Sequence, residues 1–443
     1  MSSPTGSVGA RNKLSLLVLG LCWFAILCDG LDTFVYGAAL PDMLADKSFG
    51  LDPGTAGDVG SIATFGMLLG ALGAGPLADR VGRRATLIGG VALFSIASLA
   101  CAIAPQVAVF AAARFVAGLG LGGLIPTAIS MVMEFAPIGR ANLMVAAVMT
   151  AHQTGGILAS GLGIVFLDGR GWRFLFALGA LPLLIAVPVM LKYLPESLSY
   201  LVARGRVDEA HALAARHGVT VADFTSERSG GAASVLASLR KLFVGSRKYT
   251  TLTFWVASFA GLLLVYGVAT WLPVMMRSTG YELGSALSFL LVVNLGGIVG
   301  LLIAGRAADR FGPTRIAIIW FALTAVGISL LAVKMPLPAT YFLVFLTGVW
   351  LFSAQTMVYA STAAHADADF RATAVGWTSG MGRFGAVFGP WLGGVLVASG
   401  QPKWGFAAFA IAAVVAVVAM SSIAIRERGR RPAGVAGPAL ALH

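Results

Sequence analysis

The sequence predicts an all-α membrane protein with twelve transmembrane helices in two pseudo-symmetric six-helix bundles. Hydrophobic residues make up 58% of the 443 residues and charged residues only 11%, whereas a soluble domain carries about 25% charged residues. The hydrophobic residues fall in blocks of roughly 20, the length at which an α-helix crosses about 30 Å of hydrocarbon. Motifs of the first half of the chain also recur in the second half.

The hydrophobic blocks define the spans in chain order. They cover 14–40, 55–76, 85–104, 107–133, 141–167, 173–194, 250–276, 283–305, 315–334, 338–362, 372–399 and 404–425. Helices are expected because the blocks lack the alternating pattern of about ten residues that a transmembrane β-strand has.

The spans also predict the organisation of the chain. It comprises an N-terminal segment (1–13), a first bundle (14–194), a polar central loop (195–249), a second bundle (250–425) and a tail (426–443). A short surface helix is expected in the central loop near Val207–Arg216.

The distribution of basic residues predicts the orientation. The chain carries 31 Lys and Arg against 19 Asp and Glu, a net charge of +12. With the N-terminus inside, two of these basic residues lie within spans and only six lie in outer loops: Lys47, Arg170, Arg173, Arg277, Lys334 and Lys403. The positive-inside rule therefore places both termini in the cytoplasm of a protein of the inner or plasma membrane. Orientation explains the basic charge, and no nucleic-acid partner is expected.

Two further features of the sequence concern a signal peptide and metal binding. Arg11 and Lys13 precede an apolar run that is too long for a signal peptide, so this run should remain as the first span. Cys22, Cys28 and Cys101 lie in apolar segments without metal-ligand spacing, and no metal or cofactor is expected.

Three pairs of motifs recur at a nearly constant offset of 230 to 232 residues. The loop G-P-L-A-D-R-V-G-R-R (75–84) recurs as G-R-A-A-D-R-F-G-P-T-R (305–315). Arg140-Ala141 matches Arg371-Ala372, and W-R-F (172–174) matches W-G-F (404–406). Such a duplication is typical of transporters whose halves are related by an axis along the membrane normal, with a substrate site between them.

Asp29 and Asp32 are candidates for proton coupling. They lie three residues apart and therefore about 60° apart on one helix face. A carboxylate within a span costs roughly 2.5–3.5 kcal/mol on insertion scales, so both should face the bundle interior. Loss of water and mutual repulsion favour protonation of at least one of them. The alternative is a fixed ion pair with a bundle arginine that only holds helices together.

Arg114 and Arg383 are the basic residues deep within spans. A guanidinium binds a carboxylate through two parallel hydrogen bonds, so both are candidates for binding an organic anion. Alternatively, one of them neutralises the first-span aspartates. His152 matches Arg383 in the repeat and is a candidate for the same cavity, although a membrane histidine more often serves packing.

These motifs resemble the major facilitator superfamily over residues from about 13 to 428. Within it, D-G-L-D (29–32) resembles the first span of the aromatic acid:proton symporters. R-F-V-A-G-L-G-L-G-G-L-I-P (114–126), Y-G-V-A-T-W-L-P (266–273) and G-W-T-S-G-M-G-R-F-G-A-V-F-G-P (376–390) are also similar. The resemblance adds Tyr266, Trp271 and Trp377 as candidate contacts for an aromatic ring.

The resemblance also implies a gate at the cytoplasmic mouth. In the family, the loop after the second span makes charge contacts that hold the outward-facing state closed at its inner end. The corresponding residues here are Asp79, Arg83, Arg84, Glu134 and Asp309. The alternative is that the arginines only determine topology. The chain departs from the family pattern at Pro313-Thr314 and at 198–200, after the P-E-S tripeptide (195–197).

The expected function is proton-coupled uptake of a small aromatic carboxylate, of the benzoate or hydroxybenzoate type, by a monomer in the lipid bilayer. The main alternative is a proton-coupled exporter of drugs or other small organic compounds, which the two bundle arginines disfavour for cations. No G-x-x-x-x-G-K-[ST] sequence for ATP binding and no nucleophile motif of an enzyme occurs.

Overall fold

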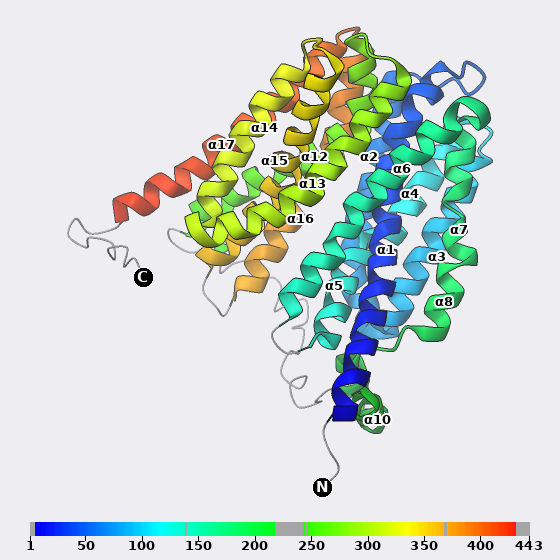
Figure 1. The fold of residues 1–443 in the computed structure, drawn as a ribbon, viewed down its shortest axis with the longest axis vertical. Coiled ribbons are helices and arrows are strands. Elements are labelled where there is room, and N and C mark those ends of the chain that lie inside the picture. The colour runs from blue at the N-terminus through cyan, green and yellow to red at the C-terminus, as the bar shows by residue number, and fades with distance from the viewer. Residues whose placement is uncertain (1–4, 138–139, 218–241, 244–246, 367–369, 431–443) are drawn as a thin grey trace.

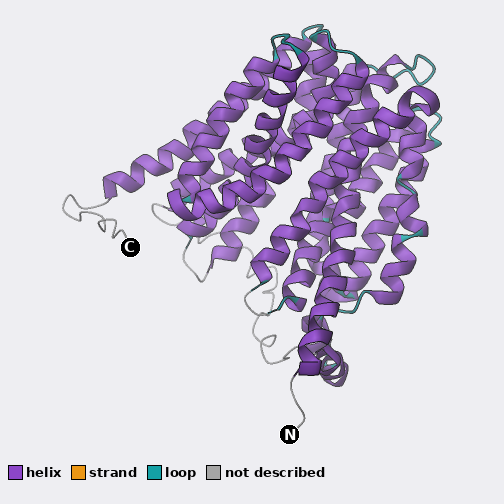
Figure 2. Ribbon diagram, in the orientation of Figure 1, coloured by secondary structure: helices purple, strands orange, loops and turns teal. Residues whose placement is uncertain are grey.

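The computed structural model describes residues 5–137, 140–217, 242–243, 247–366 and 370–430, and these contain helices and loops but no β-strand (Figure 2). The first half contains α1 (Thr5–Ala45), α2 (Pro53–Val81), α3 (Arg83–Ala102), α4 (Val107–Gly122), α5 (Leu124–Phe135), α6 (Ala141–Leu178), α7 (Leu181–Leu184) and α8 (Ala186–Tyr193). The short helices α9 (Leu198–Ala203) and α10 (Val207–His217) follow. The second half contains α12 (Arg247–Ser278), α13 (Leu283–Phe311), α14 (Pro313–Leu331), α15 (Leu337–His365), α16 (Arg371–Ala398) and α17 (Pro402–Arg430).

The predicted all-α membrane class is confirmed. Eleven helices of the described residues are long and apolar enough to cross a membrane, and a shorter apolar stretch, Leu181–Tyr193, supplies part of the sixth predicted span. The surface helix expected near Val207–Arg216 is present as α10. Within the predicted central loop (195–249), residues 218–241 and 244–246 lie outside the described residues, and α12 already begins at Arg247.

The sixth span differs from the expected continuous helix. Its first turns are the end of α6, after a kink at Gly171, whose φ of 70° lies in the region that favours glycine. The span then breaks between α6 and α7 and again between α7 and α8. Pro182 and Pro188 follow these breaks, and neither proline can donate a helical hydrogen bond. Ser98 donates to the carbonyl oxygen of Phe176 at 3.2 Å near the first break.

The repeated loop motif ends equivalent helices in the same way. Gly82 separates α2 from α3 with a φ of 98°, and Gly312 separates α13 from α14 with a φ of 85°. Because an L side chain rarely adopts this conformation, both copies of the motif require glycine at the turn.

The two halves lie side by side, and their closest contacts are nearer to one end of the molecule (Figure 1). We call the end at which α1 begins and α17 ends the terminal face, and the other end the opposite face. Toward the opposite face α2 packs on α16, α6 on α13 and α1 on α12. Toward the terminal face the ribbons of the two halves diverge, and α5 packs against helices of its own half.

Small residues form close contacts between the halves toward the opposite face. We call this set the seal: Gly37, Gly57, Gly60 and Ser61 of the first half, and Ala269, Val387, Pro390 and Gly394 of the second. A Cβ added to Gly57 would lie 2.9 Å from Cα of Gly394, and one added to Gly60 would lie 2.8 Å from Cβ of Pro390. The Ser61 hydroxyl donates to the carbonyl oxygen of Val387 at 2.7 Å. Absent side chains thus allow the backbones of the two halves to touch.

Candidate functional site

Asp29 is buried where α1 meets α6. Gly30 allows this approach, because an added Cβ would lie 2.0 Å from the backbone oxygen of His152. Asp29 is 1% exposed, and its Oδ2 lies 3.8 Å from Nε2 of His152. Neither carboxylate oxygen of Asp29 receives a hydrogen bond from a described residue. A buried carboxylate without a donor is costly, which is typical of a group that changes its proton or its partner during function.

Arg383 of α16 interacts with Asp29 from the other half of the molecule. The two side chains interact electrostatically, and Arg383 also interacts with Tyr359 of α15. Nη1 of Arg383 donates to the hydroxyl of Tyr266 on α12 at 3.1 Å. Among the described residues, no carboxylate lies within 4 Å of Arg383 as an ion-pair partner. Its remaining N–H groups are therefore suited to an anionic ligand.

Asp32 has a different environment although it lies one turn from Asp29. It forms a salt bridge with Arg114 of α4, and the two side chains are 3% and 4% exposed. The Arg114 guanidinium lies over the rings of Tyr36, at 5.4 Å, and Phe176, at 5.8 Å. Both partners of this salt bridge belong to the first half, so movement between the halves does not by itself separate them.

Aromatic rings lie beside His152 at the interface. Phe34 of α1 meets the His152 ring edge-on at 5.7 Å and the ring of Phe352 on α15 at 6.2 Å. Phe34 is fully buried and Phe352 is 6% exposed. Offset and edge contacts of this kind are worth about 0.5–1.5 kcal/mol beyond area burial. Phe34 was not predicted from the sequence, because a phenylalanine in a span is not distinguished from other apolar residues until the fold is known.

The two tryptophans predicted to contact substrate pack against other parts of the second half. Trp271 is fully buried, and its Nε1 donates to the carbonyl oxygen of Pro390 at 2.8 Å, so it joins α12 to α16. Trp377 stacks on Trp255, with ring centroids 6.2 Å apart, in a small cluster with Leu242. The hydrogen bond of Trp271 and the stacking contact of Trp377 are therefore both made to residues outside the group formed by Asp29, His152, Tyr266 and Arg383.

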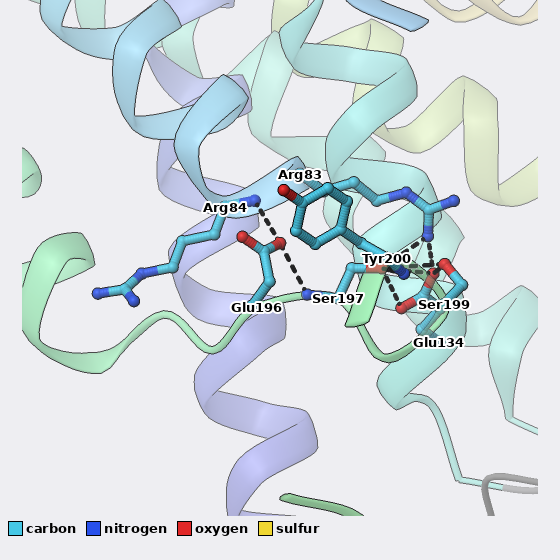
Figure 3. A network of polar contacts seen from close by, with 7 residues as sticks. All are labelled: Arg83, Arg84, Glu134, Glu196, Ser197, Ser199 and Tyr200. Carbon is cyan, nitrogen blue, oxygen red and sulfur yellow. Dashed lines mark hydrogen bonds and ion pairs between the residues drawn. The ribbon is translucent and has the colours of Figure 1, made fainter. Parts of the chain in front are cut away.

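A polar network occupies the terminal face of the first half (Figure 3). Its centre is Glu134 at the end of α5, which forms a salt bridge with Arg83 at the start of α3. Glu134 also accepts hydrogen bonds from Ser197, at 2.8 Å, and Ser199, at 2.6 Å. The network therefore ties the loop after the second span to the fourth span and to the segment after the sixth.

Glu196 extends the network to Arg84. Its Oε1 accepts from the backbone N–H of Arg84 at 3.1 Å and from that of Ser197 at 2.9 Å. The only sequence signal for Glu196 and Ser197 was the P-E-S tripeptide. Asp79 and Asp309 are exposed, and neither carboxylate forms an ion pair with a described residue.

Two pseudo-symmetric six-helix halves that meet around buried ionisable residues define a secondary transporter. Comparison with known families identifies it further, because the Major Facilitator Superfamily model matches residues 22–302 and 290–440. The chain therefore belongs to the Major Facilitator Superfamily, whose members are transporters and not enzymes.

Curated relatives place the chain with aromatic acid transporters. It is 35% identical to the gentisate transporter of Corynebacterium glutamicum, over 93% of this chain and 87% of that one. It is 34% identical to the benzoate transport protein of Acinetobacter baylyi, over 90% and 88%. It is 35% identical to the 4-hydroxybenzoate transporter PcaK of Pseudomonas aeruginosa, over 92% and 91%.

Solved structures support the fold. A partially occluded inward-open structure of the xylose transporter XylE from E. coli matches with a TM-score of 0.74 at 18% identity, over 93% of this chain and 98% of that one. An inward-open structure of the same transporter matches with a TM-score of 0.73 at 17% identity, over 92% and 95%. Both belong to a multi-pass membrane transporter with the same arrangement of helices.

Proposed function

We propose that this transporter couples the uptake of a small aromatic carboxylate, of the benzoate or hydroxybenzoate type, to protons. The observation that carries the proposal is the buried carboxylate of Asp29, which accepts no hydrogen bond from a described residue and interacts with Arg383 across the boundary between the halves. The relatives whose names state gentisate, benzoate and 4-hydroxybenzoate support this substrate class.

Electrostatics supplies the coupling. A substrate carboxylate that binds Arg383 brings a second negative charge close to Asp29, next to one guanidinium. Two like charges about 5 Å apart repel by roughly 3 kcal/mol at an effective dielectric constant near 20. Protonation of Asp29 removes this repulsion, so proton and substrate favour each other's binding.

The neighbouring rings provide the aromatic contacts. Phe34 lies beside His152, Phe352 packs against Phe34, and Tyr266 accepts a hydrogen bond from Arg383. A ring whose carboxylate binds Arg383 reaches the same region, where an edge or offset contact with phenylalanine stabilises it. Arg114 is a weaker candidate for the substrate because Asp32 already occupies it.

Transport follows from rocking of the bundles 14–194 and 250–425 against each other in a monomer. With both termini in the cytoplasm of an inner or plasma membrane, the terminal face is cytoplasmic and this conformation faces inward. Asp79 and Asp309 then contribute to a gate that forms when the halves meet at that face, and the Glu134 network holds the gating loop in shape. A C-terminal fluorescent-protein fusion that folds only in the cytoplasm checks this orientation.

Uptake of labelled benzoate and 4-hydroxybenzoate in cells tests the function, with and without a protonophore. We expect accumulation that the protonophore abolishes. We also expect Arg383→Gln to lower transport at least tenfold, whereas Arg306→Gln, an exposed arginine of α13, should retain it. Asp29→Asn should retain substrate exchange but lose accumulation. Protonophore-sensitive efflux of these acids, without uptake, would instead identify an exporter.

A further inference from the structure

His152 and Gln153 are adjacent on α6 and hydrogen-bonded through their side chains. Nδ1 of His152 lies 2.8 Å from Oε1 of Gln153. Because an amide oxygen only accepts hydrogen bonds, this contact selects the tautomer of His152 in which Nδ1 carries the hydrogen. The other ring nitrogen, Nε2, points away from Gln153.

Nε2 faces Asp29. Nε2 of His152 lies 3.8 Å from Oδ2 of Asp29, and both oxygens of Asp29 lack a donor among the described residues. A neutral imidazole lone pair and an ionised carboxylate are both acceptors, and two buried acceptors do not stabilise each other. One added proton, on either Asp29 or Nε2, converts the contact into a donor–acceptor pair.

We propose that Asp29 and His152 together hold the transported proton, and that Gln153 is the positioning residue that fixes the imidazole for this role. The inference rests on the proposed function and assigns its proton to a particular pair of side chains. One proton enters the pair from one side of the membrane and leaves it on the other, with no other bond made or broken.

The charged neighbours agree with this assignment. The titratable or charged groups near the pair are Asp32 on α1, Arg383 on α16, Tyr266 on α12 and Tyr359 on α15. The salt bridge to Arg114 of α4 compensates Asp32 within the first half. Arg383 is thus the cation whose charge a bound substrate neutralises, after which the pair retains its proton more strongly.

Gln153 also links the pair to the contact between α6 and α13. It is 4% exposed, and a Cβ added to Gly297 of α13 would lie 2.9 Å from its Nε2. When the halves separate at the opposite face, the amide loses this neighbour and gains access to water. The position of the imidazole hydrogen thereby becomes sensitive to the conformation of the transporter.

The test uses Gln153→Leu, Gln153→Glu and a matched control, Gln355→Leu. Gln355 is a second buried glutamine, 5% exposed, whose Nε2 donates to Ser258 at 3.1 Å within the second half. Two assays are run on the full chain in proteoliposomes. One measures benzoate or 4-hydroxybenzoate accumulation driven by a pH gradient, and the other measures substrate counterflow, which needs no net proton movement.

We expect Gln153→Leu to reduce the accumulation ratio to about one while counterflow stays within about twofold of the parent. Gln153→Glu keeps an acceptor for Nδ1 and adds negative charge, so it should accumulate substrate with its pH midpoint about one unit higher. Gln355→Leu should keep the parent pH profile.

Accumulation by Gln153→Leu with the parent pH profile would overturn the inference, as would loss of counterflow in both Gln153 variants. Failure of the parent protein to accumulate substrate under a pH gradient would instead refute the proposed function. The two failures are therefore distinguishable.

Discussion

Gly37 offers a direct test of the seal. A Cβ added at this position would lie 2.0 Å from the carbonyl oxygen of Ala269 and 3.1 Å from that of Thr270, both on α12. Ordinary contacts of this kind lie at 3.4–4 Å. Gly37→Ala therefore forces α1 and α12 apart by more than an ångström at the point where the two halves touch.

The magnitude follows from the cost of overpacking. Inserting a methyl group into a packed contact costs about 1–3 kcal/mol, which corresponds to about a 5- to 140-fold change in an equilibrium constant. The penalty applies only while the halves are in contact at the opposite face. Gly37→Ala should therefore shift the population toward the conformation that is open at that face.

A cysteine at Ser61 reports the shift, because its hydroxyl is held against Val387 in the closed seal. The native cysteines are buried and should give little background. We expect a membrane-impermeant maleimide, applied from the opposite face, to label Ser61→Cys at least fivefold faster when Gly37→Ala is present.

Gly118→Ala is the matched control. Its added Cβ would lie 2.1 Å from the carbonyl oxygen of Ala63, so the clash is similar but lies between α4 and α2 within the first half. It should lower thermal stability without changing the labelling rate. Equal labelling in the two glycine variants would refute the assignment of Gly37 to a conformational seal.

Three further predictions concern other contacts. Arg114→Leu leaves Asp32 buried without its salt-bridge partner and should lower the stability of the protein by about 3–5 kcal/mol. The double variant Asp32→Asn with Arg114→Gln should recover part of this loss, and thermal unfolding in detergent measures both effects. Glu134→Gln removes the partner charge of Arg83 and should lower stability by about 1–3 kcal/mol. The loss should be seen as faster proteolysis at the terminal face, and an unchanged rate of cleavage would contradict a structural role for Glu134. Hydrogen bonds from the side chains of Ser48 and Trp172 hold the pKa of Asp46 below its usual value. The stability that ionised Asp46 adds to the folded protein is therefore present at neutral pH and is lost as the pH falls through the folded-state pKa. The difference in melting temperature between the parent and Asp46→Ala should shrink on acidification.

The architecture follows from the sequence because hydrophobic length and charge asymmetry are strong physical constraints in a membrane. The interruption of the sixth span was missed, since average hydropathy does not register a local break. Pro182 and Pro188 were the available signals, but proline also occurs in continuous membrane helices. Only the packing around Ser98 and Phe176 shows where the chain departs from one helix.

The sequence predicted which ionisable residues form the candidate site, but not which of them pair with each other. Spacing places Asp29 and Asp32 on one side of α1, and it cannot say which arginine each one meets. The fold pairs Asp32 with Arg114 and leaves Asp29 near Arg383 without a hydrogen-bond donor among the described residues, so the two aspartates have different environments. The sequence also could not predict that Trp271 is buried against Pro390, because this contact depends on how α12 packs on α16.

The seal contains no charged side chain, since it is built from glycine, alanine, proline, valine and serine at contact distance. Dissolved ions screen attractions between charges but have little effect on steric fit. We therefore expect these contacts to depend little on the salt concentration of the surrounding solution. The lateral pressure and thickness of the surrounding lipid act directly on the spacing of membrane helices. We expect this contact to respond to these properties of the bilayer.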